Sequence, residues 1–240
     1  MTKNARIVLV EPTHPGNIGS VARAMKTMGF YELVLVAPKV FPAEEANALA
    51  SGAVDILESA RVVSTFEEAV KNCIFVVGAS ARSRAIPWPT STPSVLASEI
   101  IKKAIEGPVA LVFGRESSGL SNEELSKCHH HLYIPTNPEY GSLNLAQAVQ
   151  IVVYECRLAA LEMTSTLNVS ENTEPLALHQ DLEIFYNALE DMARKSGFLN
   201  PAQPRHLMTR LRRLFAKNPL TTQELNMLRG LFLALFEHRP

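Results

Sequence analysis

The sequence is poor in cysteine, in net charge and in long apolar runs, and each shortage excludes a class of protein. Its three cysteines, Cys73, Cys128 and Cys156, are odd in number and widely spaced. Such spacing argues against a disulfide framework and favours a reducing compartment. The formal net charge of −1 gives no overall attraction to a polyanion. No apolar run is long enough to cross a membrane. We therefore expect a cytoplasmic protein with no membrane partner.

The near-zero charge hides an uneven distribution along the 240 residues. Residues 1–175 carry 14 Lys and Arg against 18 Asp and Glu, whereas residues 176–240 carry 9 against 6. Between the two parts, the segment "TSTLNVSENTEP" has the Ser, Thr, Asn and Pro content of a linker. We expect one domain over residues 1–163, a linker over 164–175 and a small basic extension over 176–240.

Short continuous apolar runs alternate with helical patterns in the first part. The runs cover residues 6–10, 32–37, 73–79, 108–114 and 131–135. Because they are continuous rather than alternating, they favour a parallel sheet covered on both faces. Helical patterns follow the first run, span about 43–60 and begin again near residue 92. The sequence predicts an α/β fold.

A long helix predicted over residues 142–162 is apolar nearly all round in its first half. Such a helix must be covered on both sides, and a second subunit is the natural cover, so we expect a homodimer. After the linker, three amphipathic helical patterns and no strand indicate a small all-α extension.

Three glycine-containing turns follow predicted strands: "EPTHPGNIGSVARAM" (11–25), "LVFGRESSGLSNEEL" (111–125) and "IPTNPEYGSLNLAQA" (134–148). Open α/β sheets bind ligands at the carboxyl ends of their strands, and glycine lets the backbone approach a ligand closely. The first turn lacks the third glycine of a dinucleotide site, which disfavours a nicotinamide oxidoreductase.

Arg23 lies opposite the apolar face of the first helix, which carries Ile18, Val21 and Met25. It must face solvent, a ligand or a partner subunit. A merely solvated arginine is the alternative to a functional one.

Taken in this order, the three turns resemble the signature motifs of the SPOUT superfamily of RNA methyltransferases, most closely its tRNA ribose 2′-O-methyltransferases. The resemblance covers residues 6–160, and the basic extension resembles the C-terminal extension of those enzymes. It implies a trefoil knot in the C-terminal part of the sheet, S-adenosylmethionine (S-adenosyl-L-methionine) as cofactor, and an active site formed across a homodimer. The implied substrate is the ribose of cytidine or uridine at position 32 in the tRNA anticodon loop.

The resemblance also assigns residues to the cofactor and to catalysis. The implied cofactor contacts are Ala79, Ser80, Ala81, Gly114, Ile134, Gly141, Ser142, Leu143 and Asn144. Arg23 is the residue tied to catalysis. Because a guanidinium stays protonated, we expect it to stabilise the developing alkoxide rather than act as a base, with Ser142 or water relaying the proton. Ser142 could instead cap the helix that follows it.

Further residues are implied to contact RNA: Asn17, Arg82, Arg84, Arg115 and Glu116. Arg82 and Arg84 belong to a proline-rich loop that suits a substrate lid. The alternatives are a simple turn asparagine for Asn17 and a weak surface pair for Arg115 with Glu116.

The extension concentrates five cations with no acid between the first and the last: Arg205, Arg210, Arg212, Arg213 and Lys217. We expect them to bind RNA phosphates, against the alternative of a solvated face on a helical bundle.

The run "CHHHLYIP" places Cys128 beside three histidines, His129 to His131. Neighbours on an extended chain alternate sides and do not converge on one ion, so we expect no metal. Two alternatives stay open: a non-enzymatic RNA-binding protein on the same scaffold, and methylation at another RNA site.

Overall fold

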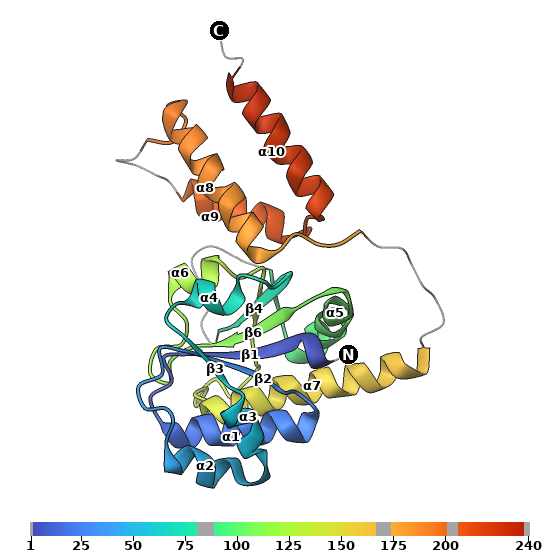
Figure 1. Cartoon of the computed structure of the whole chain (residues 1–240). Coiled ribbons are helices and arrows are strands. Elements are labelled where there is room, and N and C mark those ends of the chain that lie inside the picture. The colour runs from blue at the N-terminus through green and yellow to red at the C-terminus, as the bar shows by residue number, and fades with distance from the viewer. Residues whose placement is uncertain (1, 81–88, 167–173, 201–205, 238–240) are drawn as a thin grey trace.

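The apolar runs form the strands of one parallel sheet. The computed structural model describes residues 2–80, 89–166, 174–200 and 206–237 (Figure 1). All registered strand pairs are parallel, and the strand order is β3-β2-β1-β6-β4-β7-β5. The strands are β1 Ala5–Val10, β2 Glu32–Val36, β3 Arg61–Val63, β4 Phe75–Ala79, β5 Thr90–Ser91, β6 Val109–Phe113 and β7 His130–Leu132. Apolar runs predicted all of them except β3 and β5, which are short and mostly exposed or half-buried.

Helices cover both faces of the sheet, as the continuous apolar runs predicted (Figure 1). One core cluster joins Ile7 and Leu9 of β1 to the helices α1, α5 and α7, and a second joins Val8 and Val10 to α4 and α6. The helices of this α/β body are α1 Pro15–Met28, α2 Glu44–Ala50, α3 Val54–Glu58, α4 Phe66–Val70, α5 Pro93–Glu106, α6 Asn122–Ser126 and α7 Leu145–Thr166. The single helix expected over 43–60 is wrong, because a 3-10 turn at Ser51–Ala53 separates α2 from α3.

Helix α1 buries Ile18, Val21 and Met25 and exposes Arg23, which confirms the predicted face. Its glycines, however, serve packing. A Cβ added at Gly19 would lie 2.1 Å from the backbone oxygen of Ala46 in α2. The glycine therefore lets two helices cross closely, and the expectation that it opens backbone to a ligand is wrong at this position.

Helix α7 is covered in part by the α/β body and is exposed along the rest of its surface in the single chain. It packs against α1 and α5, and it buries Val149, Val152 and Val153. Tyr154, Leu158 and Leu161 are exposed at 47%, 38% and 52%. Their spacing places them in one stripe along the helix, which we call the α7 stripe. The helix continues to Thr166, into the segment expected as a linker.

Three helices form the extension: α8 His179–Lys195, α9 Leu207–Ala216 and α10 Thr222–Glu237. They pack around Phe185, and no strand of the sheet lies among the described residues of this part. The start of α8 is fixed to the body, because the backbone N–H groups of His179 and Gln180 donate to the carbonyls of Cys73 and Lys71 at 2.7 and 2.9 Å.

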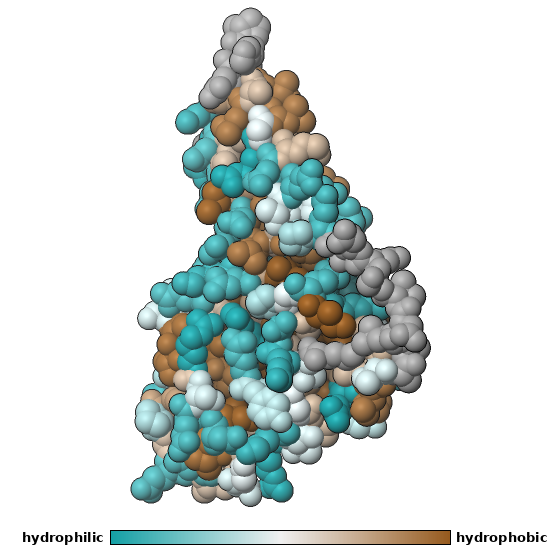
Figure 2. Space-filling model, turned by 45° about the vertical axis from the view of Figure 1, so that its right-hand side comes forward, coloured by the Kyte–Doolittle hydropathy of each residue, from teal (hydrophilic) through white to brown (hydrophobic). Residues whose placement is uncertain are grey.

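The extension also exposes apolar side chains (Figure 2). On α10 they are Met227, Leu231, Leu233 and Leu235. No helix in the described ranges is long and apolar enough to span a membrane. The expected trefoil knot stays a prediction.

Candidate functional site

A cleft opens where the carboxyl ends of β4, β6 and β7 meet. This strand-end cleft has a volume of about 500 Å³. Of the residues implied to contact the cofactor, it is lined by Ala79, Ser80, Gly114, Ile134, Gly141, Ser142 and Leu143. Residues far apart in the sequence therefore meet at the edge of the sheet where parallel α/β proteins bind ligands.

Other lining residues of the strand-end cleft were not predicted. Leu132, Leu145 and Ala148 give it apolar walls, while Tyr133 and Thr136 add hydroxyl groups. All of them lie in or beside the third glycine-containing turn. Their position near Ile134 and the third turn could have indicated them, but the sequence does not show which of these side chains face the cleft.

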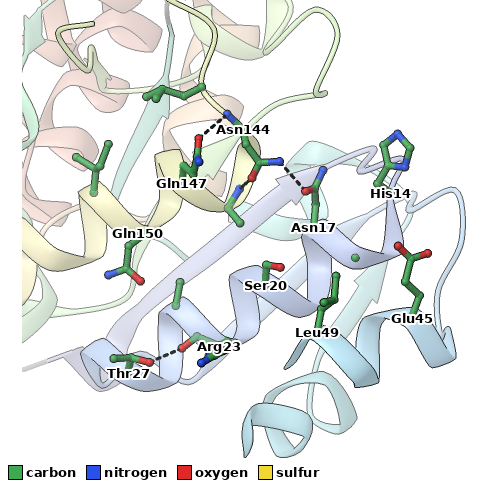
Figure 3. Close-up of a pocket in the computed structure, with 15 residues that line it drawn as sticks. His14, Asn17, Ser20, Arg23, Thr27, Glu45, Leu49, Asn144, Gln147 and Gln150 are labelled. Carbon is green, nitrogen blue, oxygen red and sulfur yellow. Dashed lines mark hydrogen bonds between the residues drawn. The ribbon is translucent and has the colours of Figure 1, made fainter. Parts of the chain in front are cut away.

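A second cleft, the α1–α7 cleft, has a volume of about 980 Å³ (Figure 3). Helix α1 contributes Asn17, Ser20, Arg23 and Thr27 to its lining, and α7 contributes Gln147 and Gln150. Ser20 and Thr27 were missed, although their spacing of three and four residues from Arg23 places them on the same face of the helix. Leu143 lines both clefts, so the two adjoin.

Arg23 is exposed in the α1–α7 cleft, and its guanidinium has no hydrogen-bond partner among the described residues. The backbone carbonyl of Arg23 accepts from Thr27 Oγ1 at 2.8 Å. A cation left unpaired at the edge of a cleft is available to an anionic ligand.

Two asparagines join the walls of the clefts (Figure 3). Asn144 Nδ2 donates to Asn17 Oδ1 at 2.8 Å, and Asn144 Oδ1 accepts from the backbone N–H of Ala146 at 2.9 Å. Asn144 thus caps α7 and lines the α1–α7 cleft rather than the strand-end cleft. Ser142, which could have been the cap, is exposed and lines the strand-end cleft.

Glu116 connects the second glycine-containing turn to the first. Its carboxylate accepts hydrogen bonds from the backbone N–H groups of Thr13 and His14 and from Asn17 Nδ2, at 3.1 to 3.3 Å. Burial raises the pKa of Glu116, but the hydrogen bonds from Asn17 and the backbone outweigh burial and hold the pKa below its usual value. An ionised Glu116 at the start of α1 also faces the positive end of the helix dipole.

Arg115, expected to contact RNA, is already engaged within the protein. Its guanidinium donates to both oxygens of Glu124, at 3.0 and 3.1 Å, and to Glu11. These bonds raise the pKa of Arg115 and lower that of Glu11. The alternative of a weak surface pair between Arg115 and Glu116 is wrong, because the two neighbouring residues have different partners.

Gly114 precedes this pair and, like Gly19, is required by the protein itself. An added Cβ would lie 2.1 Å from the backbone of Gly119, where the turn closes on itself through hydrogen bonds between Arg115 and Gly119. The strand-end cleft is thus shaped by a turn that only glycine fits.

Comparison with known proteins identifies the family. Residues 4–154 match the model of the SpoU rRNA Methylase family, and residues 180–238 match that of the C-terminal domain of the tRNA methyltransferase TrmJ. The chain is 49% identical to the tRNA (cytidine/uridine-2'-O-)-methyltransferase TrmJ of Cronobacter sakazakii, over 100% of this chain and 98% of that protein. The chain belongs to the TrmJ family of SpoU methylases.

Solved structures of the TrmJ family and its relatives agree. The crystal structure of TrmJ from Z. mobilis ZM4 has a TM-score of 0.83 and 36% identity, and the match covers 96% of this chain and 98% of that one. A structure described for the 2-OH methylation of C/U34 on tRNA has a TM-score of 0.54 and 26% identity, over 66% of this chain and 97% of that one. The SPOUT fold class predicted from the motifs is confirmed.

In this TrmJ-family chain the three consecutive histidines have separate partners. His129 Nδ1 accepts from the backbone N–H of Val76 at 2.9 Å, His130 Nε2 lies 3.0 Å from Ser91 Oγ, and His131 Nε2 lies 2.9 Å from the carbonyl of Leu125. Across the described ranges, no group of three or more His, Cys, Asp or Glu side chains could hold a metal ion.

The predicted phosphate-binding cations of the TrmJ-type extension differ in their surroundings. Arg210 and Lys217 are exposed, Arg213 is partly buried, and Arg212 is paired with Glu183. Arg82, Arg84 and Arg205, like the expected cofactor contact Ala81, lie outside the described residues.

Proposed function

We propose that this chain transfers the methyl group of S-adenosylmethionine to the ribose 2′-oxygen of cytidine or uridine in tRNA, at position 32 of the anticodon loop. The observation that carries the proposal is the pair of adjoining clefts on a TrmJ-family chain. One is a small cleft at the strand ends, and the other holds the unpaired cation Arg23. The position within the anticodon loop follows from the resemblance of the motifs.

The strand-end cleft fits the cofactor. Its volume of about 500 Å³ lies within the ordinary range of small-molecule sites. The side chains of Leu132, Ile134 and Leu145 suit an adenine ring, while the turns at Gly114 and Gly141 bring backbone polar groups to the same space. When bound, S-adenosylmethionine supplies an electrophilic methyl group on a sulfonium.

Arg23 and Ser142 have different tasks in this proposal. The ribose hydroxyl must lose its proton as its oxygen attacks, so negative charge develops on that oxygen. The fixed charge of Arg23 stabilises the alkoxide and grips a neighbouring phosphate, and it cannot act as the base because guanidinium stays protonated. Ser142 does not cap α7 and is exposed at the strand-end cleft, so its hydroxyl is available to pass the proton to water.

The active site in this proposal forms across a homodimer in the cytoplasm. Arg23 lines the α1–α7 cleft and not the strand-end cleft. The proposal is that a partner subunit covers the exposed α7 stripe and that Arg23 of one subunit acts on a ribose held beside the strand-end cleft of the other. The three buried free cysteines suit a reducing cytoplasm, where tRNA is also found.

The deciding experiment incubates the purified chain with unmodified tRNA and radiolabelled S-adenosylmethionine and then maps the methylated nucleotide. Ribose methylation of cytidine or uridine at position 32 is the expected result. Position 34 is the second candidate, because a structure described for C/U34 methylation matches two thirds of the chain. Methylation on a base, or none, would overturn the proposal.

A non-enzymatic RNA-binding protein is separated from this enzyme by cofactor binding alone. We expect the purified chain to retain radiolabelled S-adenosylmethionine in equilibrium dialysis without RNA. A chain that binds tRNA but retains no cofactor would support the non-enzymatic alternative.

A further inference from the structure

The guanidinium of Arg212 belongs to the basic segment of α9, yet it points inward onto α8. It donates to both carboxylate oxygens of Glu183, at 2.8 Å for the Nη2 bond, and lies 4.4 Å from the centre of the Tyr186 ring. Only 15% of the Arg212 side chain and 18% of the Glu183 side chain are exposed. Two parallel hydrogen bonds and an aromatic ring together fix the plane of the guanidinium.

This contact lies where the extension meets the body. A small cavity there is lined by Lys127 and His129 of the body, by His179, Glu183 and Tyr186 of α8, and by Arg212 and Ala216 of α9. The ring of His179 meets that of His129 edge-on, with 5.7 Å between their centres, and the first turn of α8 is hydrogen-bonded to the body. Helix α8 is therefore held by the body, and Arg212 holds α9 to α8.

Arg210 and Lys217 have the opposite orientation. Both are exposed, and Leu214 between them is 60% exposed. Positions 210, 214 and 217 follow each other at four and three residues, so they share the outward face of α9. Arg212 and Phe215 face inward, and Phe215 packs edge-on against Phe185 at 5.5 Å. Among the described cations of the basic segment, Arg210 and Lys217 thus face outward and Arg212 faces inward, while Arg213 is partly buried.

We propose that Arg212 is a positioning residue that clasps α9 against α8 and so presents Arg210 and Lys217 to RNA at a fixed place beside the body. Its guanidinium does not contact phosphate. This inference rests on the proposed function, because it takes tRNA as the polyanion. A guanidinium bonded through two nitrogens to a carboxylate would have to give up that bond to bind phosphate, and would leave Glu183 to repel the RNA.

Substitution of Glu183, rather than of Arg212, distinguishes a clasp from a phosphate contact. If Arg212 bound phosphate, E183Q would free it and remove a negative charge, so tRNA binding would tighten. If Arg212 is a clasp, E183Q loosens α9 and tRNA binding weakens. The matched control is E190Q, because Glu190 lies on the same helix and pairs with an exposed arginine, Arg194.

The measurement is the dissociation constant for unmodified tRNA over a series of salt concentrations. We expect E183Q and R212Q each to raise the Kd about tenfold at every salt concentration, with the slope of log K against log salt unchanged. R210Q should reduce that slope by roughly 0.7 to 0.9, the value for one lost phosphate contact. In turnover, R212Q should raise the KM for tRNA and leave kcat and the KM for S-adenosylmethionine unchanged.

The exchange R212E/E183R provides the rescue, because it rebuilds the pair with reversed polarity and keeps the net charge. We expect its Kd for tRNA to return to within about threefold of the wild type. Tighter binding in E183Q, a slope reduced by about one in R212Q, or no rescue by the exchange would each overturn the clasp.

The wild-type chain, measured in the same assays, distinguishes failure of the proposed function from failure of the clasp. If the wild type neither binds nor methylates tRNA, the proposed function fails. The clasp is then tested by thermal unfolding of R212Q, E183Q and the double variant. If the changes in unfolding temperature of the two single variants sum to that of the double variant, the two residues do not act as a pair.

Discussion

At the scale of the residue, the charged side chains divide into those that other protein groups already satisfy and those left for a ligand. Arg115, Arg212 and Glu116 each have several partners, whereas the guanidinium of Arg23 has none in the described part of the chain. Binding an RNA phosphate costs Arg23 no internal contact. It would cost Arg115 or Arg212 a bidentate ion pair.

Arg23→Lys tests whether the shape of this cation matters as well as its charge. We expect kcat for tRNA methylation to fall on the order of a hundredfold, because ammonium cannot hold an alkoxide and a phosphate through a planar fork. The affinity for S-adenosylmethionine, measured by calorimetry, should not change. Arg157→Lys is the control, since Arg157 is exposed on α7 and lines neither cleft. Near-full turnover of Arg23→Lys would contradict a bidentate role.

At the scale of the element, the two helices of the α1–α7 cleft are placed by close packing elsewhere. Gly19 allows α2 to cross α1, and Asn144 caps α7 while bonded to Asn17 of α1. These contacts fix the helices that carry Arg23, Gln147 and Gln150, so the geometry of the cleft depends on packing and hydrogen bonds within the protein.

Gly19→Ala should destabilise the fold although alanine is the better helix former. The added Cβ would lie 2.1 Å from the backbone oxygen of Ala46, which cannot move without shifting α2. We expect a loss of about 1 to 3 kcal/mol in the free energy of unfolding, measured with urea. Gly52→Ala is the matched control, because its Cβ would meet nothing within 4 Å. Equal stability of the two variants would show that α1 and α2 separate easily.

The α7 stripe provides a test of the proposed homodimer. Leu158→Glu places a charge in the middle of the exposed residues Tyr154, Leu158 and Leu161. Because burying an unpaired charge is costly, we expect the variant to sediment as a monomer and to lose methylation activity while its fold is kept. The control is Val95→Glu, at a residue of α5 that is 70% exposed. Sedimentation of the wild type as a monomer would contradict the dimer.

At the scale of the whole molecule, the junction between body and extension contains two buried histidines. His129 and His179 are 7% and 2% exposed, and neither ring nitrogen of His179 has a hydrogen-bond partner in the described ranges. Burial, with the neighbouring His179, lowers the pKa of His129 to about 3, and burial, with Arg212, lowers that of His179 to about 4. Both histidines are therefore neutral in the folded protein at neutral pH.

This pKa depression makes the stability of the protein sensitive to acid. Below pH 6.5, the ordinary pKa of histidine, the unfolded chain binds protons at these histidines and the folded chain does not. The stability that the neutral histidines allow is therefore fully present above pH 6.5 and is lost as the pH falls. As the pH falls from 6.5 toward 4, we expect each histidine to cost about 1.4 kcal/mol per pH unit.

Urea unfolding at a series of pH values measures this loss. Burial, with the neighbouring His131, also lowers the pKa of His130 to about 4, so His179→Gln should remove about a third of the histidine contribution to the slope. An unchanged slope in that variant would show that His179 is not held neutral at the junction.

The sequence by itself determined the features that depend on neighbours along the chain. Continuous apolar runs gave five strands of the parallel sheet, and helical periodicity placed Arg23 on the exposed face of α1. The second and third turns follow strands whose carboxyl ends meet at one edge of the sheet, so they placed several of the cofactor residues implied by the resemblance in the strand-end cleft.

Only the tertiary structure decided which polar residues are already used. Arg115 finds Glu11 104 positions away, Glu116 finds Asn17 99 positions away, and Arg212 finds Glu183 29 positions away. From the sequence alone, Arg23 and Arg212 both look like exposed cations on helices. In the structure, Arg23 is left for a ligand, whereas Arg212 is paired with Glu183. Hydrogen bonds and ion pairs form between groups that folding brings together, and the local sequence pattern does not reveal those distant partners.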